Sequence, residues 1–509
     1  MRALLSVTNK NRLVPFAKGL LSLGYELVST GGTYAFLSSK SVPVTQISQI
    51  TQFPEILEGR VKTLHPLIYG GILALRDSLE HITCLKDYGI VPLDLICVNL
   101  YAFGSVASRP NRTEEEVLEH IDIGGPTLIR AAAKNYRFVL PVVDPVDYVE
   151  ILSKLKTKTL GIDYRKRLAH KAFEMVSDYD RTIASYLSEN LDEPKTLPQK
   201  LSIAYTKVHD LRYGENPHQS AAFYTSEEHL RMGENAVQIH GKALSYNNLL
   251  DADVAWNLVC EFDVCTFVVV KHTSPCGVAT NPDPNIAYMD AYTGDPLSAF
   301  GGVVASNKPI SGAVAAEMAK IFYEIIIAPE FTPEAREILS GKKDLRLLVC
   351  KNQQMDSHQT ELRQIAGGLL LQTVDSIQES TDDWNVVTNR KPTASEKRDL
   401  EFAWIVSKHV KSNAITVAKD SKMLGIGGGQ PSRVGSVDIA LQKAGKLSKN
   451  AVMASDAFFP FSDSIEKAGL AGISAVIEPG GSIRDQEIID KANELGLSVL
   501  FTGVRHFKH

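Results

Sequence analysis

The sequence is poor in cysteine, with six in 509 residues and no C-x-x-C pair. Cysteines this sparse suit neither a disulfide framework nor a zinc signature, so we expect a reduced protein without bound zinc. Cys276 lies in a Ser-Pro-Cys-Gly stretch and could act as a nucleophile. Without a second thiol or a metal partner, a small buried residue is the simpler interpretation.

An excess of basic residues is also absent, since the formal net charge is −5 at pH 7. Without a general positive field, nucleic acid is not an expected partner, and an anionic ligand has to be held by local groups. No apolar run is long enough to span a bilayer, and Met1 leads directly into an apolar segment without a signal peptide. We therefore expect a soluble, cytoplasmic protein of about two to four domains.

Strand and helix patterns alternate at the start of the chain, over residues 3–7, 13–23 and 25–29, which predicts a βαβ unit and a parallel sheet. Polar turns follow both strands at the same edge of that sheet. Hydroxyls, glycines and exposed N–H groups at helix starts can bind phosphate, although ordinary helix caps have the same composition. The candidate phosphate-binding residues are Ser6, Lys10, Ser29, Thr30, Gly31, Gly32 and Thr33.

A segment over residues 53–66 is too rich in proline, glycine and charge for a core element, which favours a functional loop. It contains Arg60, Lys62 and Thr63. The strand over residues 93–99 ends in a polar tip, Asn99-Leu100-Tyr101, and Asp122 precedes Gly124-Gly125-Pro126 at a second helix start, with Lys134 two turns along. Residues 191–199 have the composition of a linker.

The second part of the chain contains an apolar, β-branched run that ends in Lys271 and His272. Pro275 and Gly277 are expected to stop the strand, which would place a cation and an imidazole at a strand tip. Strand ends of open α/β sheets bind small molecules, and this pair can transfer protons. The alternative is a strand that merely finishes in surface polar residues.

An internal repeat is visible in this part. Ala255-Trp256 precedes Lys271 by the same interval at which Ala403-Trp404 precedes Lys419. We infer a duplicated α/β subdomain, with chemistry in the first copy because the second has Asp420 in place of His272.

The last third contains a glycine cluster, Gly425 to Gly429, that lacks the G-x-G-x-x-G spacing of a dinucleotide site. Close backbone approach to a flat ligand or another loop suits it better. Residues 455–461 place three phenylalanines beside Asp456, which indicates either core packing or a stacking surface for an aromatic ligand.

Together these motifs resemble the family of bifunctional enzymes that join 5-aminoimidazole-4-carboxamide ribonucleotide (AICAR) transformylase to inosine monophosphate (IMP) cyclohydrolase. The first domain is similar in Ser-Thr-Gly-Gly-Thr, Gly-Arg-Val-Lys-Thr-Leu-His-Pro, Asn-Leu-Tyr and Asp-Ile-Gly-Gly. The second is similar in Leu-Arg-Tyr-Gly-x-Asn-Pro-His-Gln, Lys-His-x-Ser-Pro-x-Gly, Ser-Asp-Ala-Phe-Phe-Pro-Phe and the terminal Arg-x-Phe-x-His. The resemblance covers essentially the whole chain.

The resemblance implies an α/β fold with a methylglyoxal-synthase-like, parallel-sheet domain over residues 1–190. It also implies a transformylase domain over residues 200–509, built from two cytidine-deaminase-like halves at roughly 200–375 and 376–509. A homodimer with transformylase sites at the subunit interface is expected. The cosubstrate would be 10-formyltetrahydrofolate, zinc would be absent, and some family members hold a potassium ion near the transformylase site.

For formyl transfer to AICAR, the resemblance implies that His272 accepts the proton of the attacking amine and Lys271 stabilises the oxyanion. Asn413 would orient the transfer. The implied binding residues are Arg212, Tyr213, Asn216, Phe300, Gly301, Gln430, Arg433, Asp456, Phe458, Phe459 and Arg505.

For ring closure of formyl-AICAR to IMP, the implied catalytic residues are Lys62, Thr63, Tyr101 and Asp122, with Lys134 assisting. Arg60, Asn99, Gly124 and Gly125 would complete the binding site. Two alternatives stay open. The first domain could be a non-catalytic anion sensor beside a working transformylase, or the glycine cluster could mark a nucleotide-dependent oxidoreductase.

Overall fold

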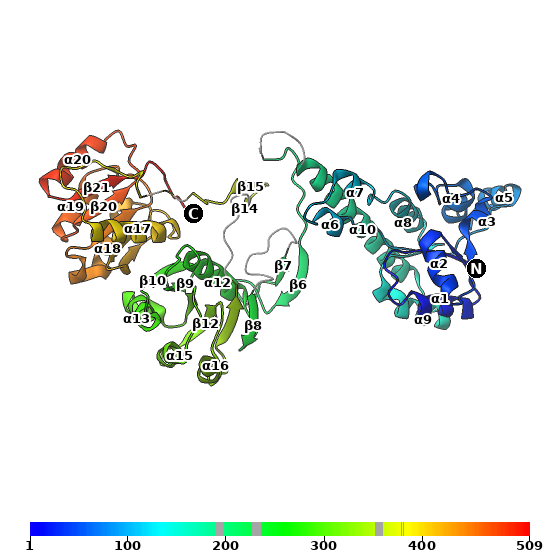
Figure 1. Ribbon diagram of the computed structural model, residues 1–509, viewed down its shortest axis with the longest axis horizontal. Helices are drawn as coiled ribbons and strands as arrows, with labels where there is room; N and C mark the ends of the chain where they lie inside the picture. Colours follow the sequence, from blue (N-terminus) through cyan, green and yellow to red (C-terminus); the bar gives the residue numbers. More distant parts are fainter. Residues whose placement is uncertain (190–196, 226–235, 352–359, 378, 380) are drawn as a thin grey trace. The chain divides into compact units, whose positions relative to one another are not determined.

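The computed structural model describes residues 1–189, 197–225, 236–351, 360–377, 379 and 381–509. The chain divides into two compact units, Met1–Ile203 and Ala204–His509 (Figure 1). Most of the predicted linker at 191–199 lies outside the described residues. Across the described ranges, no helix combines the length and apolarity needed to cross a membrane.

Unit 1 is built on five parallel strands in the order β3-β2-β1-β4-β5. In β1, Ala3 and Leu5 pack into one hydrophobic core and Leu4 into another, because successive side chains of a strand point to opposite faces. Helices therefore cover both faces, and the predicted parallel sheet is confirmed. The strands are β1 (Arg2–Ser6), β2 (Glu26–Ser29), β3 (Thr45–Gln46), β4 (Leu95–Val98) and β5 (Leu140–Val142).

The helices of unit 1 follow the apolar periodicity of the sequence. Helix α1 buries Leu13, Phe16 and Leu20 against one face of the sheet, and α8 buries Leu128 and Ile129 against the other. The helices are α1 (Leu13–Ser22), α2 (Gly31–Ser39), α3 (Ile47–Thr51), α4 (Pro66–Leu73), α5 (Leu79–Asp87), α6 (Phe103–Ala107), α7 (Glu114–Leu118), α8 (Gly124–Lys134), α9 (Tyr148–Thr157) and α10 (Ile162–Glu189), with short 3-10 turns η1 (Leu57–Gly59) and η2 (Pro145–Asp147).

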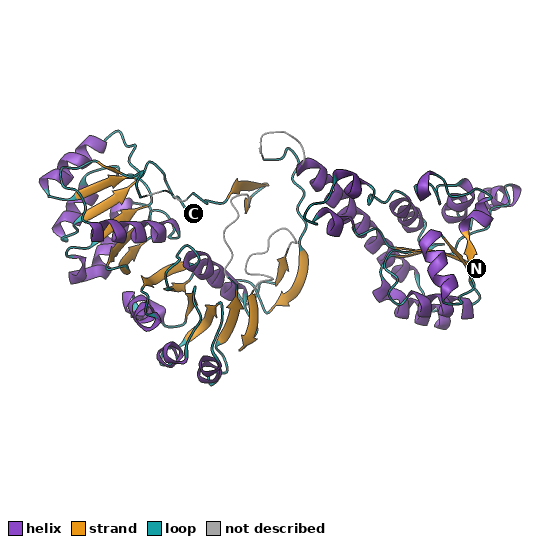
Figure 2. Cartoon of the chain, in the orientation of Figure 1, coloured by secondary structure: helices purple, strands orange, loops and turns teal. Residues whose placement is uncertain are grey.

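Unit 2 contains one twelve-stranded mixed sheet in the order β16-β21-β20-β19-β17-β18-β10-β9-β11-β12-β13-β8. Helices flank it, as the purple and orange elements of Figure 2 show. Its first half comprises β8 (Ala236–His240), α12 (Tyr246–Val259), β9 (Thr266–Lys271), β10 (Ser274–Thr280), α13 (Pro284–Gly294), α14 (Pro296–Ala299), β11 (Gly302–Ser306), α15 (Gly312–Met318), β12 (Tyr323–Ala328), α16 (Pro333–Ser340) and β13 (Arg346–Cys350).

The second half repeats this order. It comprises β16 (Asn385–Val386), α17 (Ala394–Lys408), β17 (Ile415–Lys419), β18 (Lys422–Gly427), α18 (Arg433–Ala444), η3 (Gly445–Ser448), β19 (Val452–Ser455), α19 (Asp463–Leu470), β20 (Ala475–Glu478), α20 (Asp485–Glu494) and β21 (Ser498–Phe501). The predicted duplication is therefore confirmed by topology. The halves meet where β10 and β18 run antiparallel, with Ala279 opposite Lys422, and Trp256 and Trp404 share one core.

The strand ends after Lys271 as predicted, but Pro275 and Gly277 are not what stops it. The chain turns at His272-Thr273 and returns as β10, antiparallel to β9, so Pro275 and Gly277 lie inside a strand. The register shifts between Pro275 and Gly277, and a bulge tolerates the missing proline donor. At Gly277 a Cβ would lie 1.9 Å from the carbonyl oxygen of Ala291, so glycine is required for α13 to pack this closely.

Two separate two-stranded ribbons complete unit 2, β6 (Thr206–Leu211) with β7 (Ala221–Thr225) and β14 (Thr360–Ile365) with β15 (Gly368–Thr373). Both expose apolar side chains that strands of a folded sheet normally bury. These are Val208, Tyr224, Ile365, Leu369 and Leu370.

Candidate active sites

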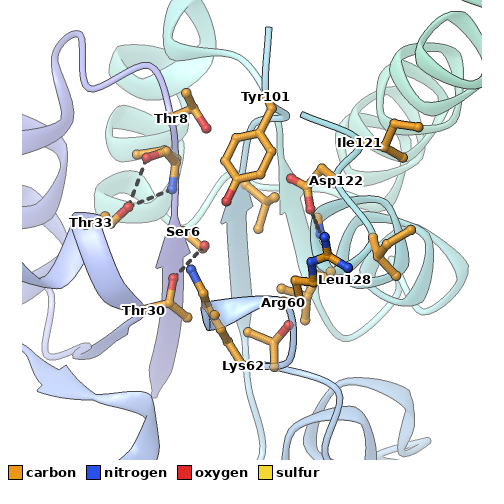
Figure 3. A pocket seen from close by; sticks show the side chains of 18 of the residues that line it. Ser6, Thr8, Thr30, Thr33, Arg60, Lys62, Tyr101, Ile121, Asp122 and Leu128 are labelled. Carbon is orange, nitrogen blue, oxygen red and sulfur yellow. Dashed lines mark hydrogen bonds between the residues drawn. The ribbon is translucent and has the colours of Figure 1, made fainter. Parts of the chain in front are cut away.

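A cavity of about 840 Å³ lies in unit 1 at the carboxyl ends of β1 and β4. The helix starts of α2 and α8 and the loop after η1 close it, and Figure 3 shows the side chains that project into it. Most of the residues predicted for the cyclohydrolase line it: Ser6, Lys10, Thr30, Gly32, Thr33, Arg60, Lys62, Thr63, Asn99, Tyr101, Asp122, Gly124 and Gly125.

One side of this cavity carries the hydroxyls of the predicted phosphate site. Ser6 Oγ lies 2.8 Å from Thr30 Oγ1, and the Thr33 hydroxyl accepts from Val7 N at 3.0 Å. The side-chain oxygen of Asn99 accepts from the backbone N–H groups of Thr8 and Asn9 at 2.6 and 3.0 Å. Asn99 thus fixes the turn after β1 and orients its polar groups.

Asp122 lies opposite, where its Oδ1 accepts from Gly125 N at 2.8 Å at the start of α8. Burial raises the pKa of this carboxyl, while the Gly125 N–H and the Lys62 ammonium oppose the rise. A Cβ at Gly125 would lie 2.4 Å from Asp122 Oδ2. Glycine is therefore needed here so that the carboxyl can face the cavity.

Lys62 and Tyr101 occupy the middle of the cavity. In Figure 3 the Lys62 ammonium points towards the Ser6–Thr30 pair, and the Tyr101 hydroxyl points into the space beside Asp122. Thr63 is buried, and a Cβ at Gly124 would lie 3.1 Å from its hydroxyl. Arg60 pairs with Glu119 at the rim. An ammonium, a phenol and a carboxyl thus surround one space, an arrangement suited to proton transfer.

Three predicted residues lie elsewhere. The Ser29 hydroxyl donates to Leu5 O at 2.7 Å inside the sheet, and Gly31 N donates to the Glu55 carboxylate at 3.2 Å. Lys134, at the end of α8, lines a separate, open cavity of about 740 Å³ with Tyr69, Arg130 and Phe173.

Sequence reasoning missed several residues that line the first cavity. Glu115 and Glu119 come from the region of α7, and Leu118, Ile121 and Ile123 form an apolar edge. Their short amphipathic pattern is that of any surface helix, so nothing in the sequence marks them. Thr8 was detectable, because it stands in the turn that was assigned to phosphate.

In unit 2, Lys271 ends β9 and His272 is the first residue of the turn between β9 and β10. His272 and Thr273 have φ angles of 53° and 58°, and Asp251 on α12 accepts from Thr273 N at 2.6 Å. The Lys271 ammonium donates to Phe300 O at 2.5 Å, which leaves two of its protons for a ligand. The Lys271 ammonium thus lies against the Phe300–Gly301 turn, and His272 follows Lys271 in the turn between β9 and β10.

A second group gathers in the other half. Arg433 donates to Asn413 Oδ1 and to Ser455 Oγ, both at 2.8 Å, and pairs with the fully buried Asp456. Asn413 Nδ2 donates to Gln430 O at 2.8 Å. Four predicted residues, Asn413, Gln430, Arg433 and Asp456, thus form one network. In the parts of the chain that the structure describes, no hydrogen bond joins this network to Lys271 or His272.

The predicted aromatic contacts separate into two kinds. Phe459 is fully buried in a hydrophobic core, and its N–H donates to Glu478 Oε2 at 2.6 Å. Phe458 and Phe300 are exposed by 38% and 60%, so their rings can meet a ligand. Of the two interpretations of this segment, core packing therefore applies to Phe459.

Each of the predicted nucleotide-binding arginines lies over an aromatic ring. The Arg212 guanidinium lies 5.4 Å from the Tyr213 ring centre and Arg505 lies 4.3 Å from that of Phe507. Asn216 donates to Gln219 at 3.0 Å and shapes the loop after β6. Among the described residues, no group of three or more His, Cys, Asp and Glu side chains is placed to hold a metal ion.

Comparison with known proteins finds similar families and relatives for the chain. The family model described as AICARFT/IMPCHase bienzyme matches residues 132–443, and the MGS-like domain model matches residues 12–127. Proteins named bifunctional purine biosynthesis protein PurH match the whole chain. Those of Bacillus cytotoxicus and Bacillus cereus are each 48% identical over 510 residues, covering 100% of this chain and 99% of theirs.

The corresponding protein of Lysinibacillus sphaericus is 47% identical over 514 residues, again covering 100% of this chain and 99% of its own. A solved structure, the crystal structure of ForH, is 36% identical and aligns with 37% of this chain and 97% of its own, with a TM-score of 0.35.

Proposed function

The chain belongs to the AICARFT/IMPCHase bienzyme family, and from this premise we propose that it catalyses two successive reactions of purine synthesis. The first transfers a formyl group from a folate cosubstrate, 10-formyltetrahydrofolate, to AICAR. The second closes formyl-AICAR to IMP with loss of water. The observation that carries the proposal is the convergence of Lys62, Tyr101 and Asp122 on one cavity beside the Ser6–Thr30 hydroxyls, within a chain that matches both family models.

We propose that formyl transfer takes place at the turn between β9 and β10. The amine of AICAR is a weak nucleophile, because its lone pair is conjugated with the ring, so it must lose a proton as it attacks. His272 accepts that proton, and the Lys271 ammonium, already oriented by Phe300 O, stabilises the oxyanion and protonates the departing folate nitrogen.

The second group of unit 2 binds and orients the reactants in this proposal. Asn413 orients the formyl group through the amide proton that Gln430 leaves free. The remaining binding residues are Arg212, Tyr213, Asn216, Gly301, Gln430, Arg433, Asp456, Phe458, Phe459 and Arg505. The exposed apolar ribbons β6–β7 and β14–β15 support a homodimer in which two chains complete each transformylase site.

We propose a potassium ion near this network, and no zinc. The residues present fit such an ion, since Asp456 Oδ2 is buried and has no hydrogen-bond partner in the described ranges, while Oδ1 pairs with Arg433. An ion held by Asp456 would neutralise this oxygen and steady the turn that follows β19. The other ligands are the small-molecule reactants. The protein acts in the cytoplasm.

Ring closure is assigned to the cavity of unit 1. The reaction is intramolecular, so holding the carboxamide nitrogen against the formyl carbon can supply up to about 7–11 kcal/mol. Lys62, Thr63, Tyr101 and Asp122 transfer protons and stabilise the oxyanion, and the turns after β1 and β2 hold the phosphate. Lys134 keeps its proposed assisting role, although it lines the separate cavity at the other end of α8. The catalytic domains are proposed as residues 1–190 and 200–509, joined by a linker at 191–199.

The test supplies purified protein with AICAR and 10-formyltetrahydrofolate and separates the products by chromatography. We expect IMP as the end product. Formyl-AICAR alone would contradict catalysis in unit 1 and favour an anion sensor there. Lys62→Ala should accumulate formyl-AICAR at an undiminished rate of formyl transfer, and unchanged IMP output from supplied formyl-AICAR would refute the role of Lys62.

A further inference from the structure

A polar pair lies where the two halves of unit 2 meet. Glu261 follows the end of α12 and His409 follows the end of α17, each five residues after the matching tryptophan, Trp256 or Trp404. The two therefore occupy equivalent positions of the repeat. His409 Nε2 lies 2.9 Å from Glu261 Oε1, so the axis that relates the halves passes through this contact.

The pair is deeply buried. The side chains of His409 and Glu261 are exposed by only 4% and 8%, and Lys408 joins them with its ammonium 3.1 Å from Glu261 Oε1. Burial alone would raise the pKa of the Glu261 carboxyl, but the His409 hydrogen bond and the Lys408 charge lower it to about 2. Burial lowers the pKa of His409. Because a carboxylate can only accept, the facing His409 Nε2 carries the hydrogen of this contact, and the Lys408 ammonium balances the carboxylate charge.

His409 begins the segment that carries Asn413, and the intervening backbone is held at each step. Val410 N donates to Ser407 O at 3.1 Å, Gly429 N donates to Lys411 O at 2.7 Å, and Ser412 N donates to Lys508 O at 2.8 Å. Because only three residues lie between His409 and Asn413, a displacement at the Glu261 contact shifts the Asn413 amide as well.

We propose that Glu261, from the first half, is a positioning residue for formyl transfer that sets the Asn413 amide of the second half through His409 and Lys408. This inference rests on the role proposed above for Asn413. Misplacement of an orienting group by about 1 Å can cost a hundredfold in rate, so removal of Glu261 should lower kcat rather than substrate affinity.

The equivalence of the two positions gives a sharp test. Glu261→His leaves two imidazoles beside Lys408, and His409→Glu opposes two carboxylates. We expect each to lower the kcat of formyl transfer at least about tenfold, with KM for AICAR within about twofold. The exchange variant E261H/H409E restores the pair in mirror image and should return to within about threefold of the original kcat. Failure of the exchange to recover activity would overturn the proposal.

Cyclisation of supplied formyl-AICAR by the same samples corrects for the amount of protein, because that site lies in unit 1, and thermal melts show whether unit 2 is folded. If the charge variants fail to fold, Glu261→Gln keeps the shape and removes the charge, and it should lower kcat about fivefold. Glu396→Gln is the matched control, since it breaks the half-buried pair with Arg390 at the other end of α17 and should lower stability without changing kcat.

A fall in melting temperature with unchanged kcat in the Glu261 variants would make the pair merely structural and refute the inference. Asn413→Ala tests the proposed role of Asn413 independently of the role of Glu261. If it keeps full formyl transfer, the proposed role of Asn413 fails, whatever the Glu261 variants show.

Discussion

The two halves of unit 2 share a backbone but use it differently. In each, an aspartate from the preceding helix holds a two-residue turn: Asp251 accepts from Thr273 N, and Asp399 accepts from Asp420 N and Ser421 N. His272 and Asp420 adopt the same left-handed conformation, with φ of 53° and 54°. The scaffold that presents a side chain at this turn is thus duplicated, while the side chain presented is not.

The residues at the buried ends of matched strands differ between the two halves. At the end of β11 the first half has Asn307, which binds the carbonyls of Phe262 and Val264, and at the end of β12 it has Ala328. The corresponding positions after β19 and at the end of β20 are Asp456 and Glu478, both fully buried. At these two matched positions the first half has an amide and an alanine, whereas the second half buries two carboxyls, Asp456 in the network around Asn413 and Glu478 beside Phe459 N.

The largest effect should come from the turn lysines, which hold matched contacts. Lys271 donates to Phe300 O and Lys419 to Lys449 O at 3.3 Å. Lys271→Ala should reduce formyl transfer by about 10²–10⁴-fold, because the oxyanion loses its cation, while cyclisation continues. Lys419→Ala is the control and should leave both rates within about twofold. Equal losses in initial-rate assays would show that the halves share the chemistry.

The next effect concerns the buried carboxyl of Glu478, whose matched position in the first half is Ala328. Burial raises the pKa of Glu478 from 4.5 to about 8. The folded chain then binds more protons than the unfolded chain between these values, so the free energy of unfolding falls as pH rises from about 4.5 to 8. Glu478→Gln removes this slope and can still accept from Phe459 N. Its stability relative to the parent should therefore rise across that window, by on the order of a few kcal/mol.

Denaturant melts at several pH values would measure this difference. Glu487→Gln, at a half-exposed carboxylate on α20, provides the control and should run parallel to the parent. A Glu478→Gln curve that also runs parallel would mean that Glu478 is ionised in the folded chain.

Gly277 and Gly425 are matched glycines at which a helix packs closely against a strand in each half. A Cβ at Gly277 would lie 1.9 Å from Ala291 O, and one at Gly425 would lie 2.0 Å from Ala440 O. Gly277→Ala and Gly425→Ala should each destabilise the protein by roughly 1–3 kcal/mol, because a helix must move away from its strand. Gly368→Ala on β15, with only Ile365 near at 3.9 Å, should be close to neutral in the same melts. Unequal losses of stability in the two variants would show that these positions are not structurally equivalent.

The smallest effect belongs to the aspartates that hold the turns. Asp251→Ala and Asp399→Ala each remove hydrogen bonds from turn N–H groups and should lower stability by about 1–2 kcal/mol. Only Asp251→Ala should also slow formyl transfer, since only that turn presents His272. A comparable loss of kcat in Asp399→Ala would contradict the division of roles.

Much of this could be predicted from the sequence. Alternating apolar segments predicted the parallel sheet of unit 1, and the spacing of Trp256 and Trp404 predicted the repeat. The hairpin after Lys271 could not be found that way, because Pro275 and Gly277 have the composition of a strand end. The strand accommodates Pro275 through a bulge and requires Gly277 because α13 packs closely there. Both depend on tertiary structure.

The site was predictable to a similar degree. Asn99, which follows β4, and Asp122, which precedes α8, both line the cavity. Lys134 does not, because its place at the last turn of α8 points it to another face, which local sequence does not encode. The glycine cluster was assigned to close backbone approach to a flat ligand or another loop, but Gly425 and Gly427 lie against the backbone of helix α18 instead.

The contact between Glu261 and His409 shows what joining the halves in one chain permits. In an assembly of two identical subunits, a residue on the symmetry axis meets its own copy, so a carboxylate there would face a carboxylate. A single chain lifts that restriction, and opposite partners can stand on the axis. Each side of the junction can then accept substitutions that the other does not share, and one ancestral surface can become two surfaces with different tasks.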